Sequence, residues 1–156
     1  ELAVWYPELV GKLVLCNPAG LRVKGTPIAD LFAMNPQESL ETIFENMDAA
    51  ASLIPAEVTT DFIMTQYREK VSLALLMWNP NYDPKLERRL ARITCPTLIV
   101  WGAKDRLIPP VYGEKWHKLI SGSKLVMMEG VGHMPMFEAL DAWMQQVEAF
   151  LQAEQE

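Results

Sequence analysis

The chain has 156 residues, of which 50% are hydrophobic and 22% are charged, and its formal net charge at pH 7 is −6. This composition is typical of one globular domain, or part of a larger one, and excludes an intrinsically disordered chain. The acidic balance argues against nucleic acid or a membrane surface as a partner. No apolar run approaches the roughly 18 residues that cross a bilayer, and no signal peptide is recognised, so we expect a cytoplasmic protein.

The chain opens on residues 1–6, which are typical of the end of a helix that Pro7 stops. Because a domain seldom opens in mid-helix without a cap, we expect the chain to be part of a longer protein. Residues 13–16 then form a short apolar run bounded by Gly11 and by Asn17-Pro18. Such a run predicts a strand buried on both faces, as in a parallel sheet.

The periodicity becomes helical between residues 25 and 92. We expect one helix over residues 36–51, a longer one that begins at Pro55, where proline suits the first turn, and a short charged helix over residues 85–91. A helical segment without a strand signal, placed between two strands, indicates a helical cap inserted into a larger fold.

Strands and helices alternate in the rest of the chain. We expect strands at 96–101 and 124–128, a helix between them that ends near residue 120, and an amphipathic helix from Phe137 onward. This alternation predicts an α/β fold, a parallel sheet flanked by helices. Residues 1–24 and 93–156 would form this core, and residues 25–92 the cap.

Two candidate catalytic residues, Asp105 and His133, each follow a predicted strand on a loop that contains glycine. Functional groups gather at the carboxyl ends of the strands in an open parallel sheet. A carboxylate there can bind one ring nitrogen of a histidine and leave the other nitrogen to accept a proton from a nucleophile. Taken singly, the Asp is more typical of a turn and the His of a structural role, so the prediction rests on the pair.

Three segments resemble parts of the α/β-hydrolase fold superfamily. Residues 96–110 are similar to its acid-bearing strand and loop, residues 130–138 to its histidine loop, and residues 6–18 to the stretch that leaves its nucleophile helix. The resemblance implies that Asp105 is the acid and His133 the histidine of a catalytic triad. It also implies that the chain is the C-terminal portion of a hydrolase, from after the nucleophile elbow to the C-terminus.

The third member of the triad is not found in the chain. In this superfamily the nucleophile lies in a G-x-S-x-G turn between a strand and a helix, ahead of the acid and the histidine. None of the five candidate serines has that setting: Ser39, Ser52, Ser72, Ser121 and Ser123. We therefore expect the nucleophile (Ser, Asp or Cys) and the oxyanion hole to lie upstream of Glu1, and the chain alone to be inactive.

Further residues are weaker candidates. We predict that a substrate pocket is lined by Asn17, Phe32, Met34, Trp78 and Met134. The alternative is ordinary packing of these side chains or, for Asn17, a role in a turn. Glu138 is expected to bind the backbone of the histidine loop, and His117 to be exposed. We expect no cofactor, and two histidines with one carboxylate do not suggest a zinc site.

The leading functional hypothesis is hydrolysis of a small, apolar substrate at an ester or carbon–carbon bond. The alternative is a non-catalytic binding or assembly module of the same fold. A redox or metal protein built on Cys16 and Cys95 ranks far below, because their spacing matches no ligand motif and both are expected to be buried free thiols. We also expect dimerisation or association through strand 13–16, which would be an exposed apolar edge.

Overall fold

A computed structural model describes residues 1–77 and 81–153, and a parallel sheet lies at its centre. The strand order is β1–β2–β3, with Leu15 beside Ile99 and Ile99 beside Leu125. The strands are β1 (Leu13–Cys16), β2 (Thr97–Gly102) and β3 (Lys124–Met128). The predicted α/β fold with a parallel sheet is confirmed, and the strand bounds differ from the prediction only at β2, by one residue at each end.

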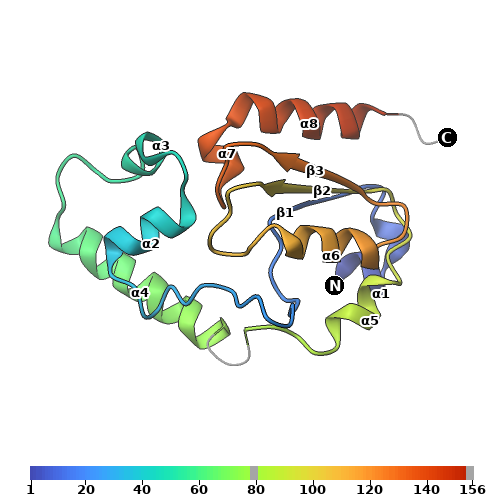
Figure 1. Ribbon diagram of the computed structural model, residues 1–156, viewed down its shortest axis with the longest axis horizontal. Coiled ribbons are helices and arrows are strands. Elements are labelled where there is room, and N and C mark those ends of the chain that lie inside the picture. Colours follow the sequence, from blue (N-terminus) through green and yellow to red (C-terminus); the bar gives the residue numbers. More distant parts are fainter. Residues whose placement is uncertain (78–80, 154–156) are drawn as a thin grey trace.

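Helices cover both faces of the sheet (Figure 1). One face packs against α1 (Leu2–Trp5), α5 (Leu86–Leu90) and α6 (Val111–Leu119), and the other packs against α8 (Leu140–Gln152). Residues of β2 alternate between the two layers: Ile99 and Trp101 contact the first, while Leu98 and Val100 contact the second. This two-sided burial explains why the strand is a continuous apolar run.

The edge position of β1 corrects one expectation. Its four residues are half-buried and not buried on both faces, whereas every residue of β2 is buried. The cause is the topology, since β1 pairs with β2 on one side only. Cys16 and Cys95 are likewise free and half-buried, not fully buried as expected.

Between residues 25 and 92 the described part of the chain contains helices and no strand. The predicted helix over 36–51 is wrong, because α2 (Pro36–Ile43) ends and α3 (Met47–Ala51) begins within it. The predicted start of the next helix at Pro55 is also wrong. That helix, α4 (Thr60–Met77), begins after Thr59, whose hydroxyl accepts the backbone N–H of Phe62. The division into core and cap stays a prediction.

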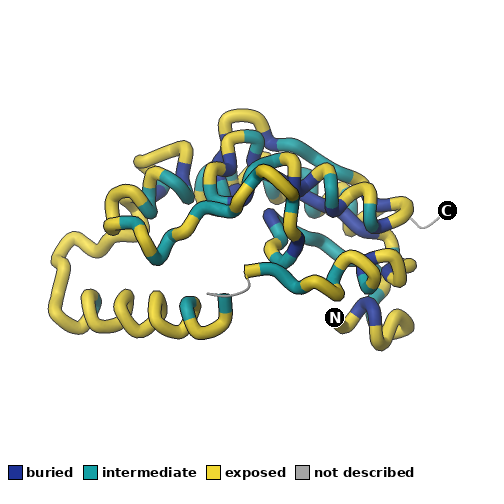
Figure 2. The backbone as a smooth tube through the Cα atoms, turned by 60° about the horizontal axis from the view of Figure 1, so that its bottom comes forward, coloured by how far each residue is buried: buried dark blue, intermediate teal, exposed yellow. Residues whose placement is uncertain are grey.

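Helix α4 is exposed along most of its length (Figure 2). Its apolar residues Ile63, Tyr67, Val71 and Leu75 recur every four residues, and Leu75 is 83% exposed. These side chains of the helix therefore do not pack into the core. None of the helices in the described residues has both the length and the hydrophobicity needed to cross a bilayer.

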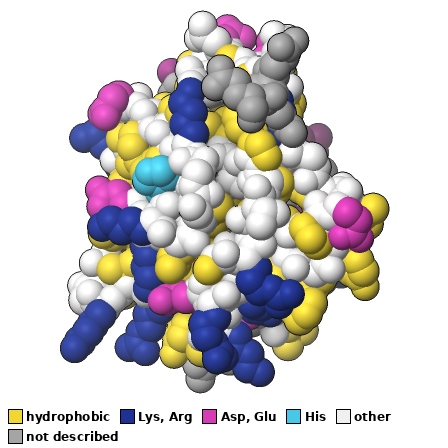
Figure 3. Space-filling view, turned by 90° about the vertical axis from the view of Figure 1, so that its right-hand side faces the viewer, with side chains coloured by type: hydrophobic (Ala, Val, Ile, Leu, Met, Phe, Trp, Pro, Cys, Tyr) yellow, Lys and Arg dark blue, Asp and Glu magenta, His cyan; other side chains and the backbone are white. Residues whose placement is uncertain are grey.

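The two ends of the sheet differ in character. The end where the strands begin carries a gathering of Lys and Arg side chains (Figure 3). At the other end the strands lead into the loops that carry Asp105 and His133, and beyond them into α7 (Pro135–Glu138). The functional candidates thus lie together at the carboxyl ends of the strands, as the topology rule predicts.

Candidate active site

Asp105 lies in the loop that leaves β2, and its carboxylate is fully oriented by hydrogen bonds. Oδ1 accepts the backbone N–H groups of Leu107 and Ile108 at 2.9 and 2.8 Å. Oδ2 lies 2.7 Å from Nδ1 of His133. The residue is only 3% exposed, so this contact is shielded from water. A buried, charged acceptor held in this way fixes the orientation of the imidazole ring.

His133 is held at both ends of its backbone as well as by its ring. Its N–H donates to the carbonyl of Ile43 at 2.7 Å, and its carbonyl accepts the side-chain amide of Asn17 at 2.5 Å. A carboxylate only accepts hydrogen bonds, so the proximity of Asp105 assigns the proton of the neutral ring to Nδ1. Nε2 then carries a lone pair, and it has no hydrogen-bond partner among the described residues. This is the arrangement that a general base requires.

The two loops are joined closely, and glycine makes the approach feasible. The N–H of Lys104 donates to the carbonyl of Val131 at 2.8 Å. A Cβ on Gly102 would lie 1.8 Å from the carbonyl oxygen of Gly132, so no larger residue fits there. The glycines that marked these loops in the sequence therefore permit the backbones to touch, which brings acid and histidine within hydrogen-bond distance.

Asn17, predicted to bind substrate, has both ends of its amide engaged within the protein. Its Oδ1 accepts the N–H of Gly102 at 3.1 Å, while its Nδ2 donates to His133. Its backbone φ is +40°, a left-handed conformation that asparagine tolerates better than most residues. The residue is 5% exposed and links the end of β2 to the histidine loop. It borders the cavity described next, but its amide serves the loop.

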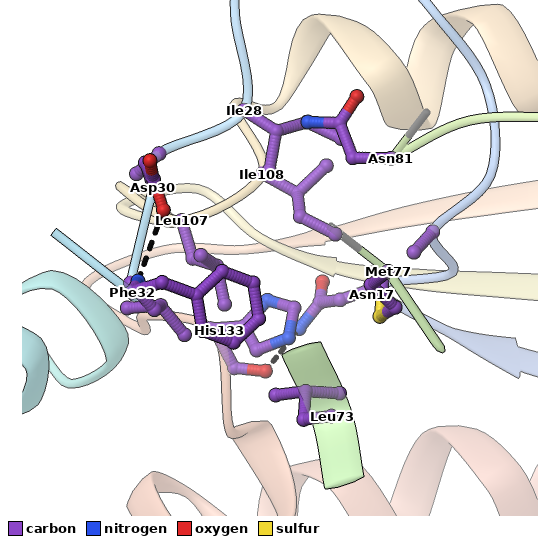
Figure 4. A pocket seen from close by; sticks show the side chains of 13 residues that line it. Asn17, Ile28, Asp30, Phe32, Leu73, Met77, Asn81, Leu107, Ile108 and His133 are labelled. Carbon is purple, nitrogen blue, oxygen red and sulfur yellow. Dashed lines mark hydrogen bonds between the residues drawn. The ribbon is translucent and has the colours of Figure 1, made fainter. Parts of the chain in front are cut away.

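A cavity of about 310 Å³ opens over His133 (Figure 4). Most of its wall is aliphatic or aromatic, and Asp30 is the single acidic residue in it. Thirteen described residues line it: Asn17, Ala19, Ile28, Ala29, Asp30, Leu31, Phe32, Leu73, Met77, Asn81, Leu107, Ile108 and His133. The wall combines the segment before α2, the end of α4 and the acid loop, so residues far apart in sequence meet over the histidine.

The remaining substrate-binding candidates are placed differently. Phe32 lines the cavity, whereas Met34 and Met134 do not. The sulfur of Met34 instead accepts the hydroxyl of Thr42 at 3.4 Å, and Met134 precedes α7, where its N–H lies 3.4 Å from Glu138. Trp78 lies outside the described residues. Leu107 and Ile108, which were missed, lie two and three residues after Asp105, and that proximity in sequence was the signal that could have found them.

Two secondary expectations are confirmed. Glu138 binds the histidine loop, since its Oε1 accepts the N–H of Gly132 at 3.0 Å. His117 is exposed, and its Nδ1 contacts the hydroxyl of Ser123 at 2.9 Å. Within the described residues, no cluster of three or more His, Cys, Asp or Glu side chains could hold a metal ion.

The Cys16 thiol lies at the end of β1, near the site. Burial raises its pKa to about 11, the Trp143 indole partly offsets this rise, and the Asp105 carboxylate adds to it. At neutral pH such a thiol stays protonated, whereas a nucleophilic cysteine needs a lowered pKa. The Cys16 thiol therefore lacks the lowered pKa of a nucleophilic cysteine.

Comparison with known proteins places this geometry in a family. The profile of the alpha/beta hydrolase family matches residues 2–146. The chain belongs to that family. The resemblance seen in the three sequence segments thus extends over almost the whole chain, including the helices between residues 25 and 92.

Individual relatives of this hydrolase-family chain have different specificities. Lipase 1 of Psychrobacter immobilis is 29% identical over 158 residues, which cover 95% of the chain and 50% of the lipase. The 2-hydroxy-6-oxononadienedioate/2-hydroxy-6-oxononatrienedioate hydrolase of Escherichia coli (strain K12 / DH10B) is 30% identical over 166 residues, 94% of the chain and 55% of that enzyme. The chain therefore spans about half the length of the curated relatives it matches.

Solved structures confirm the fold. A membrane phospholipase A described as a bacterial virulence factor aligns with a TM-score of 0.69 at 25% identity, over 96% of this chain and 51% of that one. The 2-hydroxy-6-oxo-6-phenylhexa-2,4-dienoate hydrolase of Rhodococcus sp. strain RHA1 aligns with a TM-score of 0.71 at 20% identity, over 97% and 59%. The chain corresponds in each case to a little over half of a larger α/β-hydrolase structure.

Proposed function

We propose that Asp105 and His133 are the acid and the general base of a nucleophile–His–Asp triad that hydrolyses a small, apolar substrate. The observation that carries this proposal is the 2.7 Å contact between Asp105 Oδ2 and His133 Nδ1, in which Nε2 is left without a partner beside an apolar cavity. The nucleophile comes from outside residues 1–156. No Ser, Thr or Cys is among the described residues that line the cavity.

The chemistry of the proposed reaction follows from the two residues. Nε2 of His133 removes the proton of the nucleophile as it attacks the substrate, and the resulting imidazolium is stabilised by the buried Asp105 carboxylate. His133 then returns the proton to the leaving group. It next removes a proton from the water that attacks the covalent intermediate, and it returns this proton to the nucleophile as the bond to the nucleophile breaks. The N–H groups of Leu107 and Ile108 hold the Asp105 carboxylate in place throughout.

The cavity favours a neutral substrate. Its wall is largely apolar, Asp30 is the one acidic side chain among the described lining residues, and no Lys or Arg is among them. An anionic acyl chain would lose hydration there without a cation to bind it. Of the two specificities seen among relatives, an ester linked to an apolar acyl group therefore suits this chain better than a dioate.

The full-length protein provides the test. It is expected to hydrolyse p-nitrophenyl esters of neutral medium-length acids, and Asp105→Asn is expected to lower kcat by about 10³- to 10⁴-fold, because the amide favours the wrong histidine tautomer. The 156-residue chain alone is expected to be inactive. Esterase activity that is insensitive to Asp105→Asn would contradict the triad. Complete inactivity of the full-length protein, with folding intact, would favour the non-catalytic module.

A further inference from the structure

We propose that Glu138 is a positioning residue that ties the turn between α2 and α3 to the histidine loop, so that the orientation of His133 depends on where this turn lies. The inference rests on the proposed function of His133 and deepens it. We call residues 43–46 the cap turn. It contains the break in the helix that the sequence predicted to be continuous.

The Glu138 carboxylate accepts four backbone N–H groups from two separate segments. Oε1 binds the histidine loop, with Gly132 at 3.0 Å and Met134 at 3.4 Å. Oε2 binds the cap turn, with Glu45 at 2.8 Å and Asn46 at 2.9 Å. One side chain therefore holds both residues that flank His133 and, at the same time, two residues that lie more than 90 positions away in the sequence.

A direct backbone bond completes this junction. The N–H of His133 donates to the carbonyl of Ile43 at 2.7 Å. Ile43 is the last residue of α2, where helix carbonyls lack partners within the helix, and Asn46 is the N-cap of α3. The histidine loop and Glu138 thus supply partners for groups at the interruption between α2 and α3. This explains why the chain is not helical there.

Arg106 fastens the same turn from the acid side of the site. Its Nη2 donates to the carbonyls of Glu41 and Phe44 at 2.6 and 2.7 Å, and its Nη1 forms an ion pair with Glu45. Arg106 directly follows Asp105. The loops that carry the acid and the histidine therefore both bind the cap turn, in addition to binding each other.

The segments that meet at the junction are packed closely around Gly132. A Cβ on Gly132 would lie 2.7 Å from the carbonyl oxygen of Ile43 and 2.8 Å from both Glu138 Oε1 and the nitrogen of Glu45. A shift of the cap turn must therefore move the histidine loop or break these hydrogen bonds. Misplacement of a catalytic group by about 1 Å can cost roughly 10²-fold in rate, so the coupling has a kinetic consequence.

The decisive variant is Glu138→Gln in the full-length protein, with Glu148→Gln as the matched control. Glutamine has nearly the same size as glutamate, but one of its two terminal groups is an NH₂, which cannot accept a hydrogen bond. Either the histidine loop or the cap turn therefore loses its acceptor. Glu148 lies exposed on α8. We expect Glu138→Gln to lower kcat about 10-fold or more and to change KM less than about twofold, because ground-state binding in the cavity is retained. Glu148→Gln should leave both unchanged.

Two NMR readouts separate this inference from the proposed function. Glu138→Gln should broaden the low-field Nδ1 proton signal of His133 and should accelerate hydrogen exchange at the His133 and Glu45 amides together. Neither signal requires turnover. A full-length protein without hydrolase activity would refute the proposed function, and the exchange data would still test whether the cap turn and the histidine loop are coupled. Unchanged kcat in an active protein, or an unchanged Nδ1 signal with unchanged exchange, would overturn the inference.

A second variant keeps the test valid if Glu138→Gln fails to fold. Arg106→Gln removes the ion pair with Glu45 and the guanidinium bond to Phe44 and leaves Glu138 in place. It should also accelerate exchange at the Glu45 and His133 amides and lower kcat with little change in KM. Faster exchange at Glu45 alone, with normal exchange at His133 and a normal kcat, would show that the turn and the histidine move independently.

Discussion

Replacement of Asn17 by alanine tests the structural logic of the site without requiring any activity. The Asn17 amide satisfies the N–H of Gly102 and the carbonyl of His133, both in the interior of the site. A buried group left without its partner costs about 1–3 kcal/mol, so the two together contribute about 2–4 kcal/mol after partial relaxation. The left-handed backbone, with a φ of +40°, adds about 1 kcal/mol for alanine.

The expected loss for Asn17→Ala is therefore about 3–5 kcal/mol in the free energy of unfolding, a large part of the roughly 5–15 kcal/mol that stabilises a typical domain. Urea denaturation of the full-length protein, followed by tryptophan fluorescence, measures it. Asn17→Gly is the matched control, because glycine also lacks the amide but accepts the left-handed backbone. It should be about 1 kcal/mol more stable than the alanine variant.

Each part of this reasoning has its own contrary result. A loss below about 1 kcal/mol for Asn17→Ala would show that the amide is not needed to satisfy the two backbone groups. Equal stability of the alanine and glycine variants would show that the backbone at this position is not strained. Neither result would depend on the identity of the substrate.

Three other predictions concern the loops, the thiol and the sheet edge. Gly132→Ala is expected to lower Tm by several degrees in calorimetry and to displace the histidine loop, because its Cβ would lie 2.7 Å from the carbonyl of Ile43; a normal Tm would contradict this contact. Cys16 should react with iodoacetamide at pH 8 about 100-fold more slowly in the folded than in the unfolded protein, because its pKa is raised from 9.0 to about 11 and a smaller fraction of the thiol is ionised. Equal rates in the two states would refute the raised pKa. The isolated 156-residue chain should dimerise or aggregate through β1, which pairs with another strand on one side only. A monodisperse monomer in light scattering that melts cooperatively would count against this.

Local patterns predicted those parts of the fold that local chemistry determines. The buried strand β2, the strand β3 and the two glycine-containing loops were recognised from short apolar runs and turn residues. The meeting of Asp105 and His133 followed from one topological rule, since both lie after parallel strands of the same sheet. The contact did not require knowledge of any residue in the cap.

Long-range partners determine what the sequence pattern missed. The break between α2 and α3 is bound by Glu138, whose carboxylate accepts the N–H groups of Glu45 and Asn46 from far along the chain. Asn17 borders the cavity, but the sequence did not indicate that its amide is bound by groups from two other segments. Helix α4 has an apolar stripe typical of a packed helix, yet that stripe is exposed, because helical periodicity does not indicate which surface a helix contacts.

The most direct test of the central claim compares the two histidines of the chain. In the full-length protein, His133→Ala should reduce hydrolysis of a neutral p-nitrophenyl ester by about 10²- to 10⁴-fold, the usual contribution of a general base. His117→Ala should retain nearly normal activity, because that residue is exposed and its ring is hydrogen-bonded to Ser123, away from the cavity. Similar losses in both variants, or full activity without His133, would contradict the assignment of His133 as the catalytic base.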